Sequence, residues 1–306
     1  MIPVVIVEGP TASGKSSLAL ALAENLGSQI ISADSRQIYK YLDIGTAKPD
    51  QVDRKRVKHH LIDFLEPSEA YNAGAFIHAA AEIISSLHDQ GLIPVICGGT
   101  GLYIRSLLEG LCKLPPIPSR IREELWEELN QKSLEELHSE LTSLDPISAG
   151  RISVNDKQRI LRALEVYRFT GKPLSRHWQD QNPENNYQAF RILIDPPREH
   201  LYSRIDQRMD LMLSQGLINE LTTVLQMGFR ETDPGLNSVG YKEFIPFLQG
   251  ELSLEEALIL AKQHSRNYAK RQMTWYRKQT FDLTIPSSDF NLSDINRLLS
   301  DKLKPV

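Results

Sequence analysis

Residues 4–16 read Val-Val-Ile-Val-Glu-Gly-Pro-Thr-Ala-Ser-Gly-Lys-Ser. The apolar run from Val4 to Val7 is typical of a strand that is buried on both faces. From Ser16 to Leu26 apolar residues recur at helical spacing, and Gly27 follows them as a stop signal. Between the two, Gly9 to Ser16 fits the phosphate-loop pattern G-x-x-x-x-G-K-[ST] at every fixed position. Strand, loop and helix together predict an α/β domain of the P-loop type.

The chemistry of a phosphate site requires these residue types. Glycines allow the backbone to wrap tightly around an anion and to turn its N–H groups inward. The following helix adds the positive end of its dipole. Lys15 is expected to reach the outer phosphates, and the Ser16 hydroxyl is expected to bind Mg²⁺. The predicted phosphate-binding residues are Gly9, Pro10, Thr11, Ala12, Ser13, Gly14, Lys15 and Ser16.

Other signatures of nucleotide hydrolases are missing from the sequence. No apolar strand ends in the usual acidic pair, and no Asn-Lys-x-Asp segment is present to recognise guanine. The loop therefore predicts a site for a di- or triphosphate, as in ATP- and other nucleotide-binding proteins, without identifying the ligand. A protein that hydrolyses ATP or GTP is disfavoured.

Two more strand patterns follow the phosphate loop. Ile30–Ile31 and Leu92–Cys97 are short apolar runs, and Ala73–Gln90 between them has helical spacing. Strands that alternate with helices predict a parallel sheet with helices on both faces. Ligands bind beyond the carboxyl ends of such strands. Asp34 and Thr100, which follow the two runs, are therefore expected to face the phosphate loop.

Asp34 and Thr100 each have two interpretations. Asp34 is a candidate general base or a partner of the magnesium ligands, and the alternative is an aspartate of a turn or helix N-cap. Thr100 lies in the segment Gly98-Gly99-Thr100-Gly101, whose glycines allow a ligand to approach closely. Its alternative role is the N-cap of the next helix. Position along the chain leaves both pairs of interpretations open.

A helical insertion is expected in the middle of the chain. The segment Leu114-Pro-Pro-Ile-Pro118 is typical of a linker, and only helical patterns follow it to about Pro183. Ser133 with Glu136 predicts a capping box within this stretch. Arg191–Asp195 then has the composition of another strand. We predict a P-loop domain of residues 1–114 and 187–306, interrupted by an all-helical insertion domain of residues 115–186.

The longest predicted helix is basic. It opens with a capping box at Ser253 and extends to about Lys278. No acidic residue occurs between residues 257 and 281, where Lys262, Arg266 and Lys270 share one face because they are four residues apart. Aromatic residues lie among these cations, which suits a polyanion whose bases can stack. A solvated helix face with aromatics in the core is the alternative.

Bulk properties bound the class of protein. The 306 residues carry a formal net charge of −4, so any nucleic-acid binding must come from local basic patches. Two cysteines, Cys97 and Cys112, indicate neither a disulfide framework nor a zinc site, and Cys97 is expected in the core. No basic leader or apolar stretch of roughly 18 residues is found. These features predict a cytoplasmic protein that does not associate with membranes, and no self-association seam is seen, which predicts a monomer.

Taken together, the motifs of this chain resemble those of the tRNA dimethylallyltransferases (tRNA isopentenyltransferases) in their compact bacterial form. The phosphate loop is generic, but the other motifs are specific to this family, and they run in family order over nearly the whole chain. They are Gly-Pro-Thr-Ala-Ser-Gly-Lys-Ser at 9–16, Asp-Ser-Arg-Gln-Ile-Tyr at 34–39, Asp-Ile-Gly-Thr-Ala-Lys-Pro at 43–49, His-His-Leu-Ile-Asp at 59–63, Gly-Gly-Thr-Gly-Leu-Tyr at 98–103, Gln-Arg-Ile-Leu-Arg-Ala-Leu-Glu at 158–165, Val-Gly-Tyr-Lys-Glu at 239–243 and Tyr-Ala-Lys-Arg-Gln-Met-Thr-Trp-Tyr-Arg at 268–277.

The resemblance implies transfer of a dimethylallyl group from dimethylallyl diphosphate to the exocyclic amine of the tRNA adenosine just 3′ of the anticodon. The phosphate loop would hold the departing pyrophosphate, with Mg²⁺ on Ser16. Lys15 and Arg208 would neutralise charge that develops on the departing group. Asp34 would accept a proton from the attacking amine, and Thr100 would help to position the adenine.

The resemblance also implies contacts to the anticodon stem-loop of tRNA, with further candidates in the helix from Ser265 to Gln272. The implied residues are Asp34, Ser35, Arg36, Gln37, Thr100, Arg122, Gln158, Arg159, Ile160, Leu161, Arg162, Val239, Gly240, Tyr241, Lys242, Arg266, Lys270 and Arg271.

Two other classes of protein stay open when the residues alone are considered. A small-molecule or nucleotide kinase accounts for the phosphate loop and Asp34, but not for the basic aromatic helix. A non-catalytic nucleic-acid-binding NTPase accounts for the basic helix, but it leaves Asp34 and Thr100 without a role. Prenyl transfer to RNA is the activity that separates all three.

Overall fold

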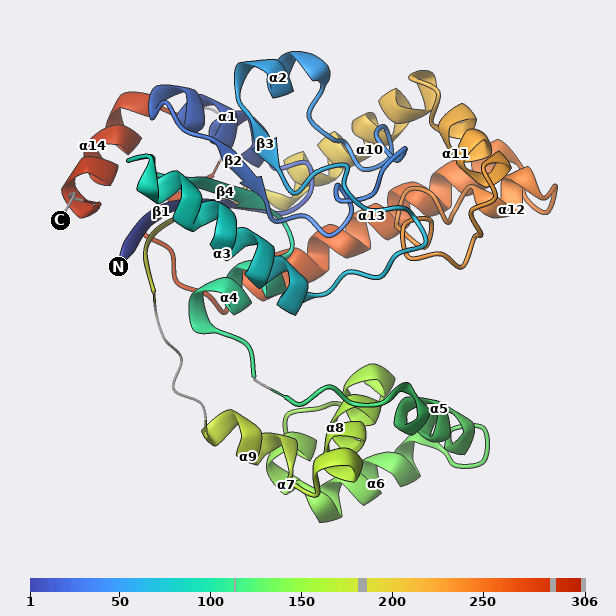
Figure 1. The fold of residues 1–306 in the computed structure, drawn as a ribbon. Helices are drawn as coiled ribbons and strands as arrows, with labels where there is room; N and C mark the ends of the chain where they lie inside the picture. Colours follow the sequence, from blue (N-terminus) through green and yellow to red (C-terminus); the bar gives the residue numbers. More distant parts are fainter. Residues whose placement is uncertain (113, 181–185, 287–289, 304–306) are drawn as a thin grey trace. The chain divides into compact units, whose positions relative to one another are not determined.

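The computed structural model describes residues 1–112, 114–180, 186–286 and 290–303, and the chain divides into two compact units (Figure 1). Met1–Glu109 together with Asn185–Val306 forms one of them, which we call the sheet unit. Gly110–Glu184 forms the other, which we call the insertion unit.

The sheet unit is built on six parallel strands in the order β3-β2-β4-β1-β5-β6. Strand β1 lies inside the sheet, with Ile6 opposite Ile96 on one side and Arg191 on the other. This arrangement confirms the predicted parallel α/β sheet. The strands are β1 (Ile2–Glu8), β2 (Ile30–Ser32), β3 (His59–His60), β4 (Val95–Gly98), β5 (Tyr187–Ile194) and β6 (Leu283–Ile285).

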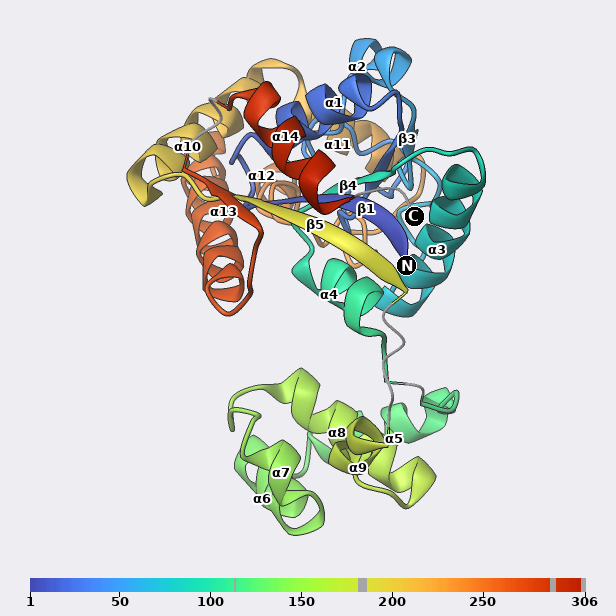
Figure 2. The same cartoon turned by 90° about the vertical axis from the view of Figure 1, so that its left-hand side faces the viewer.

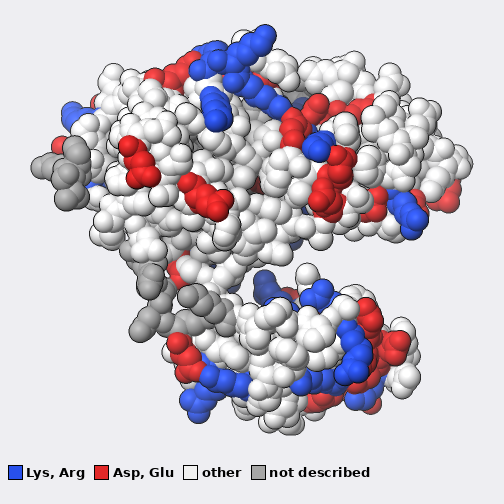
Figure 3. All heavy atoms as spheres, viewed as in Figure 1, with Lys and Arg blue, Asp and Glu red and all other residues white. Residues whose placement is uncertain are grey.

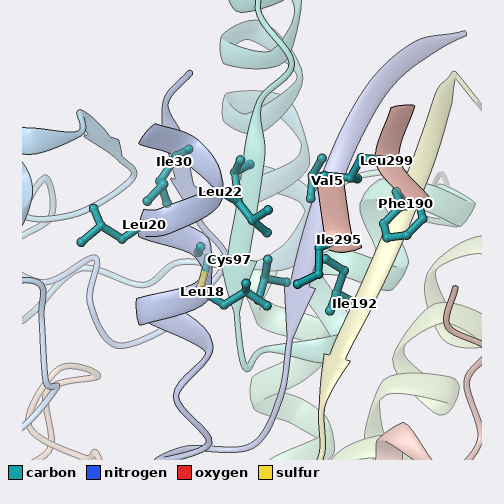
Figure 4. Packing of buried hydrophobic residues seen from close by; sticks show 14 of the residues in the cluster. Val5, Leu18, Leu20, Leu22, Ile30, Cys97, Phe190, Ile192, Ile295 and Leu299 are labelled. Atoms are coloured by element: carbon teal, nitrogen blue, oxygen red, sulfur yellow. The ribbon is translucent and has the colours of Figure 1, made fainter. Parts of the chain in front are cut away.

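Helices cover both faces of the sheet (Figures 1 and 2). On one face, Leu18 of α1 (Lys15–Asn25) and Ile295 of α14 (Leu292–Lys302) pack in one apolar cluster with Val5 and Ile192 (Figure 4). On the other face, α3 (Ala73–Asp89) and α4 (Gly101–Glu109) pack against Val4 and Ile6. The alternating β-branched residues of β1 therefore fill two cores at once, as its continuous apolar run predicts.

Four further helices of the sheet unit contribute to a third apolar cluster beyond the sheet, in which Tyr241 and Phe244 are completely buried. The predicted capping box at Ser253 and Glu256 is confirmed. Among the described residues, no helix is both long and apolar enough to cross a membrane. The helices of this cluster are α10 (Arg198–Ser214), α11 (Leu217–Gln226), α12 (Ile245–Leu248) and α13 (Leu254–Tyr276), whereas α2 (Gln51–Arg56) has no buried residue and lies outside it.

The insertion unit is helical throughout its described residues and has its own core, which includes Leu137, Leu141 and Leu164. The predicted capping box of Ser133 and Glu136 is present at the start of α6. The insertion domain was predicted over residues 115–186, and the insertion unit of the structure is Gly110–Glu184. The helices are α5 (Ser119–Glu128), α6 (Leu134–Leu144), α7 (Pro146–Ala149), α8 (Lys157–Thr170) and α9 (Leu174–Gln179).

The strands differ from the sequence-based expectation at their ends. The third predicted strand begins at Val95 and not at Leu92, because Pro94 has no N–H to donate to a neighbouring strand. Strand β5 begins four residues before Arg191, at Tyr187, because it pairs with β1 from Ile2 onward. Strand β3 is an edge strand of two histidines, and nothing in its composition predicts a strand.

One loop of the sheet unit is held by a carboxylate and a buried phenol. Glu220 accepts hydrogen bonds from the backbone N–H groups of Asp43 (2.9 Å), Ile44 (2.9 Å) and Gly45 (3.3 Å). The Tyr241 hydroxyl donates to Glu220 and accepts from the Gly45 N–H at 2.9 Å. Burial raises the pKa of Tyr241 well above its ordinary value, so the hydroxyl keeps its proton. A Cβ on Gly45 would lie 2.4 Å from the Tyr241 ring, which explains the glycine.

Tyr241→Phe is therefore expected to lower the free energy of unfolding by about 1–2 kcal/mol, because the Gly45 N–H and Glu220 each lose a buried partner. Urea denaturation followed by circular dichroism measures the change. Tyr71→Phe is the matched control, since the Tyr71 hydroxyl is buried and has no hydrogen-bond partner among the described residues. Its free energy of unfolding should stay within about 0.5 kcal/mol of the unchanged chain. Equal losses in the two variants would show that the Tyr241 hydroxyl has no special role.

Candidate active site at the phosphate loop

The phosphate loop joins the carboxyl end of β1 to the first residue of α1. Ala12 and Gly14 have φ angles of 62° and 96°, which turn the backbone back on itself, and the Ser13 N–H donates to Pro10 O at 3.2 Å. Gly14 precedes Lys15, where α1 begins, so the positive end of the helix dipole faces the loop. This is the geometry in which backbone N–H groups converge on an anion.

Two partly buried cations lie against the phosphate loop. Lys15 Nζ donates to Pro10 O at 3.2 Å, and Arg208 of α10 donates to the Thr11 hydroxyl. Burial lowers the pKa of both cations, and the Asp34 carboxylate opposes that shift in each. The positive charge of Arg208 lowers the pKa of Lys15 further. A bound polyanion would offset both the desolvation and the repulsion, so the site is suited to a diphosphate.

Asp34 and Thr100 lie at the ends of the neighbouring strands β2 and β4. Asp34 Oδ1 accepts from the N–H of Arg36 at 2.8 Å, which is an Asx turn. The Thr100 hydroxyl accepts from the Ser35 N–H at 3.0 Å and donates to the Ser35 hydroxyl at 3.3 Å. Asp34 therefore forms a turn, and its carboxylate also interacts electrostatically with Lys15 and Arg208. The described bonds of the Thr100 hydroxyl connect two loops and do not cap α4.

The glycines around Thr100 accommodate the protein's own groups. A Cβ on Gly98 would lie 2.1 Å from the carbonyl oxygen of Ala33, and one on Gly101 would lie 2.0 Å from the Trp275 ring nitrogen. These glycines were expected to allow a ligand to approach closely. The contacts in the structure are tight packing between the β2 and β4 loops and against α13.

Helix α13 places two buried side chains at the phosphate loop. Gln272 is 7% exposed, and its amide bonds the Thr11 N–H and the Gly99 carbonyl oxygen, both at 2.8 Å. Tyr276 is 3% exposed and donates to Gly9 O at 3.3 Å. This helix was predicted either to bind a polyanion or to place its aromatic residues in the core, and neither alternative placed Gln272 at the phosphate loop. Its four-residue spacing indicates that Gln272 and Tyr276 share a face, but not that this face meets the loop.

The residues of the sheet unit that were predicted to contact tRNA differ in how exposed they are to solvent. Arg36 donates to Pro234 O at 3.0 Å, and Gln37 donates to Ala47 O at 3.1 Å, so both side chains also support nearby loops. Gly240 and Tyr241 are buried, whereas Lys242 is exposed. Because Tyr241 holds the loop at Gly45, Lys242 is the residue of this segment that remains a candidate for direct contact.

The cationic row of α13 is partly neutralised. Lys262 pairs with Asp210 at 2.6 Å, and Arg266 pairs with Asp206 at 2.6 Å, so both link α13 to α10. Lys270 and Arg271 are exposed, and no ion pair is found for either among the described residues. Figure 3 shows cationic and anionic side chains lying close together on the visible face of each unit. The candidate contacts on α13 therefore narrow to Lys270 and Arg271.

The predicted contacts of the insertion unit narrow in the same way. Arg122 and Arg162 both pair with the buried Glu165, at 3.0 and 2.8 Å. Ile160 and Leu161 are 0% and 6% exposed and belong to the core of the unit, so their side chains cannot meet a nucleic acid. Gln158 and Arg159 are exposed, and the side chains of Arg122 and Arg162 are 59% and 42% exposed despite their ion pairs, so these four stay candidates.

The donor set at the phosphate loop fits Mg²⁺. Among the described residues no group of three or more His, Cys, Asp or Glu side chains could hold a metal ion alone. Ser16 is an exposed residue at the start of α1 whose hydroxyl also hydrogen-bonds Cys97, and the Asp34 carboxylate acts on the adjacent Lys15. Mg²⁺ prefers oxygen ligands and is usually held by one or two of them together with water and substrate phosphates. Burial raises the pKa of Cys97 to about 11, which leaves it a neutral core thiol, as predicted.

Comparison with known proteins identifies a consistent set of relatives. A family model described as IPP transferase matches residues 37–279, and one described as isopentenyl transferase matches residues 2–64. The chain is 45% identical over 277 residues to a tRNA dimethylallyltransferase of Geobacter metallireducens, covering 90% of each. It is 44% identical over 278 residues to that of Syntrophobacter fumaroxidans, covering 90% of this chain and 81% of the relative.

Solved structures that resemble this chain have descriptions of the same kind as its sequence relatives. A tRNA isopentenylpyrophosphate transferase from Bacillus halodurans matches with a TM-score of 0.72 and 34% identity, covering 99% of this chain and 97% of its own. A eukaryotic dimethylallyltransferase acting on tRNA matches with a TM-score of 0.83 and 27% identity, covering 100% and 81%.

Lys15→Ala is expected to weaken binding of inorganic pyrophosphate by roughly 10- to 100-fold, because hydrogen bonds to a charged group contribute about 1.5–3 kcal/mol. Isothermal titration calorimetry measures the change. Lys15 binds the anion only while protonated, so affinity should fall as the pH rises through its lowered pKa, and the variant should lack this step. Lys40→Ala, which removes a lysine paired with Glu66, is the control. A comparable loss of affinity in Lys40→Ala would contradict the assigned phosphate site.

Proposed function

Because the chain belongs to the IPP transferase family, the tRNA dimethylallyltransferases, we propose that it transfers a dimethylallyl group from dimethylallyl diphosphate to tRNA. The acceptor is the exocyclic amine of the adenosine 3′-adjacent to the anticodon, and pyrophosphate is released. One observation supports this proposal most. Lys15 and Arg208 both lie against the phosphate loop. Burial lowers the pKa of each cation, and the Asp34 carboxylate opposes that shift in both.

The phosphate loop binds the diphosphate of the donor. The bond between the allylic carbon and the diphosphate oxygen breaks, and the electron pair leaves with that oxygen. Lys15 and Arg208 lie where negative charge then grows, and they stabilise it more strongly in a desolvated site than they would in water. The Thr11 hydroxyl accepts from Arg208 and so fixes the direction in which the guanidinium points.

Mg²⁺ would be held at this loop by the Ser16 hydroxyl and the phosphate oxygens of the donor, with Asp34 available to its bound water. When bound, it neutralises charge on the diphosphate. The remaining roles belong to side chains of the chain itself.

Asp34 acts on the acceptor. An adenine amine is a weak nucleophile, so the reaction needs alignment and removal of a proton as the new nitrogen–carbon bond forms. The Asx turn holds the Asp34 carboxylate at the end of β2, and Thr100 is tied to the same turn through Ser35. Thr100 is thereby placed to orient the adenine. The base must leave the anticodon-loop stack to reach this position.

The tRNA backbone meets exposed cations on each unit. Lys242, Lys270 and Arg271 belong to the sheet unit, and Arg159 belongs to the insertion unit. Phosphate contacts position the RNA, and the reacting adenine supplies the specificity at the site. All the assigned residues come from a single chain, so the proposal requires no second copy.

Asp34→Ala is expected to lower kcat by about 10²- to 10⁴-fold, the usual contribution of a general base. The assay measures transfer of label from radiolabelled dimethylallyl diphosphate to tRNA that lacks the modification, with Mg²⁺ present. Pyrophosphate affinity should stay within a few-fold, because the phosphate loop is unchanged. Asp89→Ala, at an exposed carboxylate that ends α3, should behave as the unchanged chain. The proposal fails if no label enters tRNA while ATP is consumed with a small-molecule acceptor, which would indicate a kinase.

Lys270→Ala and Arg271→Ala are each expected to weaken tRNA binding and to reduce the slope of log affinity against log salt by about 1. Filter binding over a range of salt concentrations measures both. Lys262→Ala is the matched control on the same helix, because its ammonium already pairs with Asp210. A larger loss of affinity in Lys262→Ala than in Lys270→Ala would contradict the assignment by exposure.

A further inference from the structure

The side-chain amide of Gln272 joins two loops that are far apart in the sequence. Its oxygen accepts from the backbone N–H of Thr11 at 2.8 Å, and its nitrogen donates to the carbonyl oxygen of Gly99 at 2.8 Å. Gln272 is 7% exposed, so neither bond competes with bulk water. A Cβ on Gly99 would lie 2.5 Å from the amide nitrogen, and the glycine thus makes this approach possible.

The two loops serve different substrates under the proposed function. Thr11 belongs to the phosphate loop, which takes the donor diphosphate. Gly99 directly precedes Thr100, which faces the acceptor adenine through its connection to Ser35. A single planar amide therefore spans the donor and acceptor sides of the reaction.

Through its bond to Thr11, Gln272 is also connected to Arg208, a cation at the leaving diphosphate. The Thr11 N–H donates to Gln272, and the hydroxyl of the same residue accepts from Arg208. The position of Arg208 thus depends on Thr11, and that of Thr11 depends on Gln272. A hydrogen-bonded series runs from the acceptor loop through Gln272 and Thr11 to a cation at the diphosphate.

The same helix supports this connection on either side of Gln272. Tyr276 lies one turn further along α13 and donates to Gly9 O at 3.3 Å, where the phosphate loop begins. Trp275 packs so closely on Gly101 that a Cβ there would lie 2.0 Å from the ring nitrogen. The helix is therefore a rigid element against which both loops are held, and Gln272 is the residue that bonds both.

We propose that Gln272 is a positioning residue that couples the donor loop to the acceptor loop, so that occupation of either site orders the other. The inference rests on the proposed function for the identity of the two substrates. An amide presents one acceptor and one donor on the same planar group, as does a protonated carboxylic acid. An ionised carboxylate keeps the bond to the Thr11 N–H but repels the Gly99 carbonyl oxygen.

The test compares Gln272→Met, Gln272→Glu and the control Gln263→Met, which changes an exposed glutamine of the same helix. We expect Gln272→Met to lower kcat roughly 10- to 100-fold, because small errors in alignment of the reacting atoms have effects of this size. Its affinity for pyrophosphate alone should fall less than kcat does, since Lys15 and Arg208 are both retained and only the hydrogen bond that orders Thr11 is lost. Gln263→Met should match the unchanged chain in both measurements. Gln272→Met with an unaltered kcat would overturn the proposal.

The pH profile separates positioning from general stability. The ratio of kcat for Gln272→Glu to kcat for the unchanged chain should rise as the pH falls, because protonation of the new carboxyl group restores a donor toward Gly99 O. The rise should follow the titration of the new carboxyl group itself and be absent from Gln272→Met. A ratio that is constant with pH would overturn the proposal even if both variants are less stable.

A binding measurement separates this inference from the proposed function. In the unchanged chain, saturating pyrophosphate should change the affinity for tRNA by several-fold, and in Gln272→Met this factor should fall toward one. If the unchanged chain transfers no label to tRNA, the proposed function fails, while this factor still tests the coupling. An equal factor in the two proteins would overturn the coupling whether or not transfer occurs.

Discussion

Strand β1 is enclosed on every side, and the phosphate loop takes its position from that enclosure. Val4, Val5, Ile6 and Val7 are 0% exposed, with β4 and β5 paired along the two edges and helices packed on the two faces. Burying side chains of this kind contributes roughly 1.5–3 kcal/mol each, so the strand cannot slide without a large loss of stability. Gly9 leaves the strand where a Cβ would meet Ile194 O at 2.7 Å. The path of the loop is thereby narrowly defined.

Charge beneath the loop is balanced within the core, which leaves the cations of the site available to a ligand. Glu8 is completely buried and pairs with Arg191 at 2.7 Å, and burial raises its pKa. Arg191 in turn stacks on Phe281 at 4.8 Å. Because Glu8 is already compensated by Arg191, Asp34 is the carboxylate that acts on both Lys15 and Arg208. One carboxylate cannot neutralise both positive charges, and the negative charge of a bound diphosphate would do so.

Local motifs were read correctly where a few adjacent residues define the structure. The phosphate loop, the buried strand before it and the capping box at Ser253 depend on neighbours in sequence, so their patterns are sufficient. Residues that contact nucleic acid were harder to predict, because the exposure and ion pairing of a side chain depend on residues far away in the sequence. Helical spacing alone does not predict that Lys262 pairs with Asp210. Nor does it predict that Ile160 is buried in the core of the insertion unit.

By itself the sequence determined the class of fold, the phosphate loop and the candidate base Asp34, because each depends on residue type at short spacing. Its motifs also determined the family, which the relatives confirm. Only the tertiary structure decided that Gln272 joins Thr11 to Gly99, residues separated from it by 261 and 173 positions. A hydrogen bond across such a distance is set by how α13 packs against the sheet unit, and packing is a property of the whole chain.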